Sequence, residues 1–354
     1  MAPPAIPAQK GGSAVSRLFS KHTTDNQKTY VDVDHEHMPA LLSLRARIAE
    51  AGMQIPRELV VNGDVDATLY RFLRARKYDV HLAFAMLEKS LAWRAQVGAD
   101  TILEQPVDAH FTSVVRQCRP SSYIGHDQEH HPIFIERLGQ LDGKRMEREG
   151  ATDDVILAYH LREMEFMSQV VLPEASAAAG RTQDRTVTVM DAAGLSLSSL
   201  TGFAQRLFRV ITAMDSDNYP ECCHAIYIAN AGAAFSAIWK LLAAFVDRGT
   251  RDKVHVLGGT KASKAALLDA FGPDLVPTFL GGQLNYEAVR QQWLDKMDAA
   301  IAQRQQHPCG KQVRRSWCWS KHSQAAATLT CCAAGCGGHA DSWHALATHN
   351  QVHP

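Results

Sequence analysis

Beyond Arg119, short β-rich runs alternate with longer helical stretches, and this alternation constrains the fold more than any other feature. The predicted strands, in which β-branched and aromatic residues concentrate, are Ile133–Glu136, Thr186–Met190, Ala225–Ala229 and Val254–Leu257. Helical spacing is found between them, near residues 153–171, 199–214 and 233–246. Strands that alternate with helices form βαβ units, so the sequence predicts an α/β fold with a mainly parallel sheet.

The region ahead of the strands, residues 41–105, has a helical pattern throughout. Apolar residues within 69–73 share one helical face, and the same spacing resumes after Asp79, a residue type favoured at the N-cap. We therefore expect short helices packed on each other as a small all-α lobe, followed by a larger domain over residues 106–285.

The two ends of the chain lack these patterns. Residues 1–40 are rich in small residues and Pro without apolar periodicity, which predicts a disordered leader, although the acid-free start also weakly resembles a transit peptide. Residues 286–306 predict a helix that is polar on most faces. Residues 307–354 are rich in Cys, His, Ala and Gly, and we expect a low-complexity tail outside the core.

The charge balance excludes a general attraction to polyanions, because Lys plus Arg and Asp plus Glu each number 37. We therefore expect no nucleic-acid partner. The sequence shows neither a run of about 20 apolar residues that would span a bilayer nor the apolar stretch of a secretory signal. These features predict a cytoplasmic protein.

The eight cysteines do not have the spacing of a secreted disulfide scaffold, so we expect reduced thiols. Near the end of the chain, Cys331, Cys332, Cys336 and His339 lie close together. Zinc binding and reversible acylation of the cysteine pair are alternatives to unstructured low complexity there. Because the spacing matches no zinc finger, we expect no metal.

Sequence motifs of common enzymes are missing. The chain has no Gly-x-Ser-x-Gly elbow, no Walker loop, no Gly-x-Gly-x-x-Gly after a strand and no His-Glu-x-x-His. We therefore expect a binding protein with no catalytic residues and no cofactor. An esterase or phosphatase on the same fold stays the alternative, because many enzymes assemble their sites from scattered residues.

Two helical stretches carry unusual side chains. Arg71, Arg74 and Lys77 are spaced three apart, which fits either a solvated helix face or contact with phosphate. Residues 233–246 are apolar nearly all round, although they are too short to span a bilayer. This second pattern means full burial, a protein partner, or a face toward an apolar ligand.

Two pairs of polar residues belong to the predicted strands. Glu221 and Lys253 each lie just ahead of a strand, so in a parallel sheet they emerge at the same edge, as a salt bridge or as a shared polar site. Thr186 and Thr188 lie on one face of a strand. Their hydroxyls fit either ordinary β propensity or contact with a ligand's phosphate.

Together, several strings resemble the CRAL-TRIO family of phosphatidylinositol transfer proteins. They are LYRFLRARKYDV (69–80), LAWR (91–94), FIERLG (134–139), VMDAAG (189–194), NYPE (218–221), IYIANA (226–231) and FLGG (279–282). The resemblance covers roughly residues 45–285. It implies a helical N-terminal lobe, a lipid-binding lobe, and exchange of phospholipid between membranes without covalent chemistry.

The resemblance also assigns site residues. The positions that hold the phosphatidylinositol headgroup match Arg76, Lys77, Glu221, Thr250 and Lys253. Those of a second site, for phosphatidylcholine, match Tyr123, Phe134, Met164, Thr186 and Thr188. Phe134 and Met164 stand where the family pattern has tyrosines. Aromatic faces contribute about 0.5–2 kcal/mol each to binding of a quaternary ammonium, so we expect a compromised choline site.

In this resemblance, residues 233–246 are a gate that covers the acyl chains on one face and meets the bilayer with the other. Its expected side chains are Phe235, Ile238, Trp239, Leu242, Phe245 and Val246. Acyl chains in water cost about 0.8 kcal/mol per methylene, so exchange must occur while the protein is docked on a membrane.

The resemblance further implies a monomer whose partners are phospholipid, a transient membrane surface and a phosphoinositide kinase that receives the lipid. It places the protein in the cytoplasm, peripherally associated with Golgi or other endomembranes. A carrier of a tocopherol-like ligand is a further alternative. Glu221 and Lys253 argue against it, because a ligand without a headgroup leaves this pair unused.

Overall fold

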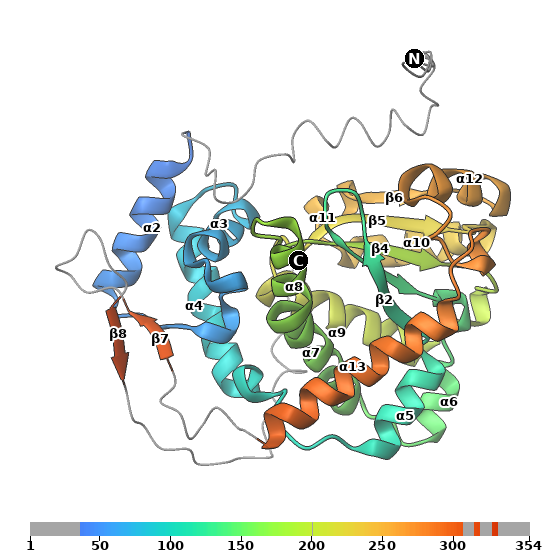
Figure 1. The fold of residues 1–354 in the computed structure, drawn as a ribbon, viewed down its shortest axis with the longest axis horizontal. Coiled ribbons are helices and arrows are strands. Elements are labelled where there is room, and N and C mark those ends of the chain that lie inside the picture. Colours follow the sequence, from blue (N-terminus) through green and yellow to red (C-terminus); the bar gives the residue numbers. More distant parts are fainter. Residues whose placement is uncertain (1–35, 200, 307–314, 319–327, 332–354) are drawn as a thin grey trace, which may run out of the picture.

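A computed structural model describes residues 36–199, 201–306, 315–318 and 328–331 (Figure 1). Residues 1–35 of the predicted leader, and the Cys/His-rich motif from Cys332 onward, for which zinc binding and acylation were the alternatives to low complexity, lie outside the described residues. Figure 1 shows a group of N-terminal helices beside a larger part built around a sheet. No helix in the described ranges is both long and apolar enough to cross a membrane.

The N-terminal lobe is built from α2 (Met38–Glu50), α3 (Val65–Ala75) and α4 (Val80–Val97). The Asp64 side chain caps α3, and the Asp79 side chain accepts a bond of 2.9 Å from the Leu82 amide at the start of α4. The predicted N-cap is therefore confirmed. The apolar faces of the three helices meet in one core, whose fully buried members include Leu44, Ile48, Leu69, Phe72, Leu73 and Leu87.

The sheet has five strands in the order β2-β3-β4-β5-β6. Their bounds are Ser121–His126, Pro132–Glu136, Thr186–Asp191, Cys223–Ala229 and Val254–Val256. β2 and β3 are antiparallel, whereas all later neighbours are parallel. The α/β fold and the four predicted strands are confirmed. β2 escaped prediction because its Ser, Gly and His residues have low strand propensity.

In the larger domain one helix precedes the sheet, β2 and β3 form a hairpin, and helices follow each strand from β3 onward. Their bounds are α5 Ala109–Cys118, α6 Gly143–Arg148, α7 Asp153–Phe166, a π-helical turn Met167–Val171, α8 Leu172–Ala179, α9 Gly202–Asn218, α10 Ala233–Leu242, α11 Arg248–Asp252, α12 Thr260–Phe271 and α13 Tyr286–Gln306. Short 3₁₀ helices lie at Arg57–Leu59, Val61–Gly63, Ala99–Thr101, Leu138–Gln140, Leu197–Ser199, Ala243–Phe245 and Thr278–Leu280.

Helices cover both faces of the sheet. On one face, Ile133, Ile135, Val187 and Val189 are at most 1% exposed and pack with residues of α12 and the start of α13. The opposite face meets α10 near β5. Such two-sided cover is typical of parallel sheets.

The sequence predicts that the last long helix, α13, is polar on most faces, but in the structure this helix packs against the sheet domain. It crosses the β2 edge of the sheet (Figure 1). The Trp293 ring lies 4.9 Å from the Tyr123 ring and 5.2 Å from the Phe166 ring. Met297 and Ile301 are buried. Covering an edge strand in this way prevents its pairing with another chain.

Two short segments of the C-terminal tail also pair with the N-terminal region. β7 (Arg315–Cys318) is antiparallel to β1 (Ile55–Pro56), and β8 (Thr328–Cys331) is antiparallel to β7. The structure therefore differs from the expectation that the whole tail stays apart. Edge pairing through backbone hydrogen bonds requires little apolar periodicity, which explains why the sequence pattern did not reveal it.

Candidate functional site

A polar cluster of Arg74, Glu221 and Lys253 lies at the amino-terminal edge of the parallel strands. The Lys253 Nζ atom is 3.2 Å from Glu221 Oε2 and donates a bond of 2.9 Å to the Cys223 carbonyl. An Arg74 guanidinium nitrogen lies 3.4 Å from the same Glu221 oxygen. The prediction that Glu221 and Lys253 emerge at one edge is confirmed, because β5 and β6 are parallel neighbours.

Arg74, rather than Arg76 or Lys77, supplies the cation from the helical lobe. Arg76 ends α3, and its guanidinium donates to the Ala75 carbonyl at 3.1 Å. Lys77 is exposed and has a positive φ of 50°. Thr250 lies half-buried in α11, where its amide is bonded to Asp247. For these three residues a role in headgroup binding stays a prediction.

Arg71 lies neither on a solvated helix face nor at a phosphate site, the two alternatives that the sequence left open for Arg71, Arg74 and Lys77. Its side chain is 2% exposed. Its Nε atom donates to the Pro220 carbonyl at 2.9 Å, and a terminal nitrogen lies 2.8 Å from Cys222 Sγ. Arg71 thereby holds the turn that carries Glu221, whose φ of 58° is uncommon outside glycine. Burial raises the pKa of the Cys222 thiol to about 11, so this sulfur stays protonated.

A row of side chains runs across the sheet on the face opposite to α12. The sheet row consists of Tyr123, Phe134, Thr188, Ile226 and Val254, which are register partners on five consecutive strands. All are half-buried. Central strands of a parallel sheet are normally buried on both faces. The partial exposure of the row shows that its cover is incomplete.

The structure gathers most of the predicted second-ligand residues around this row. Tyr123 and Phe134 have ring centroids 5.0 Å apart, and Phe134 pairs with Thr188. Met164 in α7 belongs to the same apolar cluster as Tyr123. Thr186 is buried instead, with its hydroxyl 3.5 Å from the Cys222 carbonyl, which favours a structural role for this residue.

The gate helix, residues 233–246, consists of α10 and the following 3₁₀ turn. Phe235 and Ile238 are buried, Phe235 packs with Ile228 of β5, and the Trp239 ring stacks on Phe235 at 6.1 Å. Val246 is buried and Leu242 half-buried. One side of the helix thus covers part of the sheet row.

The other side of the gate helix faces outward. Leu241 is 61% exposed and Phe245 is 45% exposed. The Arg209 guanidinium lies 4.9 Å from the centre of the Phe245 ring. Full burial of the helix is therefore the wrong interpretation of its sequence. Its second apolar side remains available to a partner or a membrane.

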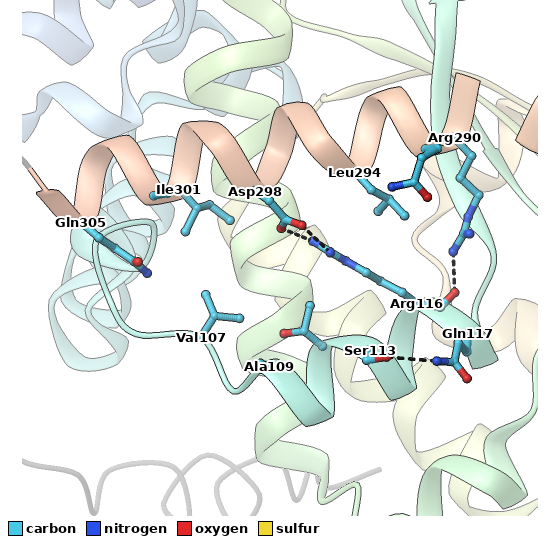
Figure 2. Close-up of a pocket in the computed structure, with 13 residues that line it drawn as sticks. Val107, Ala109, Ser113, Arg116, Gln117, Arg290, Leu294, Asp298, Ile301 and Gln305 are labelled. Carbon is cyan, nitrogen blue, oxygen red and sulfur yellow. Dashed lines mark hydrogen bonds and ion pairs between the residues drawn. The ribbon is translucent and has the colours of Figure 1, made fainter. Parts of the chain in front are cut away.

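A separate pocket of about 560 Å³ lies between α5 and α13 (Figure 2). Figure 2 shows Arg116 directed at Asp298, to which it makes bonds of 2.8 and 2.6 Å. None of the predicted site residues lines this pocket. Its polar lining includes Arg116 and Asp298, whose ion pair joins α5 to α13.

The sequence is similar to proteins of one known family. Residues 116–282 match the CRAL/TRIO domain, and residues 21–89 match the CRAL/TRIO N-terminal domain. The phosphatidylinositol/phosphatidylcholine transfer protein SFH7 of Arabidopsis thaliana is 38% identical over 60% of this chain and 38% of its own length. SFH9 of the same plant is 36% identical over 70% of this chain and 42% of its own length. The chain thus spans about two fifths of these relatives.

A shorter relative is covered more fully. The SEC14 cytosolic factor of Candida glabrata is 32% identical over 71% of this chain and 80% of its own length. Among solved structures, Sfh5 has a TM-score of 0.53 at 17% identity and is matched over 98% of its chain and 75% of this one, which shows a shared fold. The protein belongs to the CRAL/TRIO family.

Proposed function

We propose that this protein binds a phospholipid, most favourably phosphatidylinositol, and exchanges it between membranes. The observation that carries the proposal is the half-buried sheet row beneath the gate helix, whose outward side is also apolar. A soluble binding protein with a permanently buried ligand would need only the inward apolar side. Exposed Leu241 and Phe245 fit a helix that meets the bilayer when cargo leaves or enters.

The energetics favour exchange on the membrane without an energy source. Each methylene exposed to water costs about 0.8 kcal/mol, so a phospholipid cannot leave through water at a useful rate. Moving the same chains between a bilayer and an apolar cavity is close to neutral. Opening of the gate helix on a membrane is therefore sufficient.

The polar cluster supports an inositol phosphate headgroup. Arg74 and Lys253 carry donors that suit phosphate oxygens, and Glu221 carries acceptors that suit inositol hydroxyls. Lys253 immediately precedes Val254 of the sheet row, so headgroup and acyl chains would occupy adjoining regions. The relatives SFH7 and SFH9 are named as phosphatidylinositol/phosphatidylcholine transfer proteins, which agrees with this cargo.

The test has two parts. Lipids extracted from the purified full chain are identified by mass spectrometry, and the chain is then assayed for transfer of phosphatidylinositol between vesicles. We expect about one phospholipid per protein and transfer without chemical change of the lipid. Absence of both bound lipid and transfer would refute the proposal, and lipid hydrolysis products would support the esterase or phosphatase alternative instead.

We further propose that the protein works as a cytosolic monomer without catalytic activity, that it visits Golgi or other endomembranes, and that it presents phosphatidylinositol to a phosphoinositide kinase. A relative named as a cytosolic factor supports the compartment. Cell fractionation and light scattering test location and mass. Kinase output on vesicles, with and without the protein, tests presentation.

A further inference from the structure

Glu129, His131 and His224 form a group that lies apart from the polar cluster and the sheet row. The potential ligand atoms of the three side chains all lie within 4.8 Å of one another. The two imidazole rings stack at 4.0 Å, although they come from segments more than 90 residues apart in sequence. We call these residues the histidine cluster.

The backbone is shaped to bring these side chains together. Thr186 pairs with Cys223 and Val187 pairs with Ala225, so His224 is an extra residue that has no register partner on β4. Such a β-bulge redirects a side chain and is common beside functional sites. In the β2–β3 hairpin, His130 has a positive φ of 66°, and this turn carries Glu129 and His131.

Two members of the histidine cluster, Glu129 and His131, are held by hydrogen bonds from their neighbours. The carbonyl of Glu129 accepts bonds from Arg181 at 3.1 Å and Gln183 at 2.7 Å. The Nδ1 atom of His131 lies 2.9 Å from Asp127 Oδ2. An ionised carboxylate only accepts hydrogen bonds, so Nδ1 of His131 donates, and the tautomer that makes this bond has its lone pair on Nε2.

His224 adds an unsatisfied group. Its Nδ1 atom is buried and has no hydrogen-bond partner in the part of the chain that the structure describes. A buried polar atom without a partner costs about 1–3 kcal/mol, so such atoms are rare unless a ligand satisfies them. Arg185 lies near His224, and its positive charge would disfavour a bound cation. The Asp184 carboxylate, 3.6 Å from Arg185, offsets that charge.

We propose that the histidine cluster binds a divalent transition-metal ion of the zinc type. Two imidazoles and one carboxylate are a recurrent ligand set for such ions, with a remaining position open to water. Asp127 would orient His131 as an outer-sphere carboxylate. Ligand atoms around tetrahedral zinc lie roughly 3.4 Å apart. Metal binding would therefore shorten the present separations of up to 4.8 Å and turn the two stacked rings until their lone pairs converge.

The metal would join the β2–β3 hairpin to the start of β5, one residue beyond the Cys223 carbonyl that accepts from Lys253. The proposal does not depend on lipid exchange, because all members of the cluster lie outside the polar cluster, the sheet row and the gate helix. It can therefore fail or succeed on its own.

Titration of the metal-free full chain with Co²⁺ tests the proposal, because cobalt substitutes for zinc and absorbs visible light. We expect one equivalent to bind with the visible bands of nitrogen and oxygen ligands. His131→Ala and His224→Ala should each weaken binding at least about tenfold, and Asp127→Asn should weaken it about 10- to 100-fold. His110→Ala, which removes a histidine beside Glu149 elsewhere on the surface, should change nothing.

Far-UV circular dichroism checks that each variant is folded. If His224→Ala does not fold, Glu129→Gln decides, because Glu129 lies in the hairpin turn and the substitution preserves shape. Unchanged Co²⁺ affinity in the folded cluster variants would overturn the proposal. A spectrum dominated by thiolate-to-cobalt charge transfer would also overturn it, because the ion would then be bound by cysteines.

Discussion

Arg94 of α4 and Glu165 of α7 form a buried two-bond ion pair that joins the helical lobe to the sheet domain. The two bonds are 2.8 and 3.0 Å long, and the side chains are 1% and 0% exposed. The Tyr219 hydroxyl also donates to Glu165 at 2.5 Å, and Arg94 donates to Asp100 at 2.7 Å. The hydrogen bonds of the two buried charged groups are therefore satisfied.

Removing one partner of this pair should destabilise the protein strongly. Arg94→Met leaves the Glu165 carboxylate buried without its cation, so we expect the free energy of unfolding to fall by about 3–5 kcal/mol in urea titrations. Arg206→Met is the matched control, because Arg206 is exposed and its pair with Asp153 should contribute at most about 1 kcal/mol. Equal losses in both variants would contradict this assignment.

His160 should make stability fall at alkaline pH. Burial alone would lower its pKa, but Asp215, 2.9 Å from Nε2, and Glu163 outweigh burial and raise the pKa to about 9. The unfolded pKa is about 6.5, so the contribution is complete below that pH and is lost as the pH rises through 9. It is on the order of 3 kcal/mol.

Urea unfolding at pH 6 and pH 9.5 measures this effect. The difference in stability between the two pH values should be markedly smaller in His160→Gln than in the natural sequence. A pH dependence identical in the two proteins would show that His160 does not titrate in this range.

Lys253→Ala should impair phosphatidylinositol transfer without unfolding the protein. The substitution removes a charged donor, and hydrogen bonds to charged groups contribute about 1.5–3 kcal/mol, so transfer should fall about 10- to 100-fold. Arg74→Ala in addition should abolish it. Lys261→Ala, at an exposed position of α12, is the control. Normal transfer by the double variant would refute the headgroup assignment.

A charge on the outward side of the gate helix should slow exchange. Leu241 is 61% exposed, so Leu241→Glu should change the free energy of unfolding by less than about 0.5 kcal/mol. Burying a leucine in an apolar phase contributes about 1.5–3 kcal/mol, so vesicle binding and transfer should fall at least tenfold. Ser236→Glu places the same charge on a polar exposed position of α10 and should have a smaller effect. Equal effects would argue against membrane contact through Leu241.

Restoring the two tyrosines of the family pattern should strengthen binding of choline headgroups. Phe134 lies in the sheet row, and Met164 belongs to the apolar cluster of Tyr123. Met164→Tyr adds one aromatic face, which contributes about 0.5–2 kcal/mol, and Phe134→Tyr adds a hydroxyl, so the double variant should raise phosphatidylcholine transfer about twofold or more. Phosphatidylinositol transfer should stay unchanged. An unaltered ratio of the two lipids would contradict this prediction.

Local patterns were sufficient for most of the fold. Apolar periodicity predicts the helices of the lobe, and runs of β-branched residues predict β3 to β6, because these elements bury regular faces. The position of Glu221 and Lys253 ahead of parallel strands predicts their contact. The strand β2 required tertiary information, since it has no regular apolar face. In α13 the packed apolar residues recur at helical spacing, at Tyr286, Val289, Trp293, Met297 and Ile301, but this spacing does not reveal which elements they pack against.

The residues of the candidate site could likewise be predicted only in part from local sequence patterns. Arg71 and Arg74 are equivalent in spacing, yet Arg71 is buried against the Pro220 turn and Arg74 reaches Glu221. Helical spacing places side chains on a face but does not reveal what packs against that face. Strand alternation, applied to Ile226 and Val254, would have found the remainder of the sheet row. The histidine cluster depends on a β-bulge at His224, and no local sequence pattern predicts this bulge.

The polar cluster draws Arg74 from the helical lobe and Glu221 with Lys253 from the sheet domain. A phosphate bound to both cations would therefore act as a reversible cross-link between the two halves of the molecule. By mass action, occupancy raises the free energy needed to separate them. Protein with bound phospholipid would resist heat and proteases better than protein without it. The lifetime of the protein in the cell would therefore increase with the supply of its phospholipid.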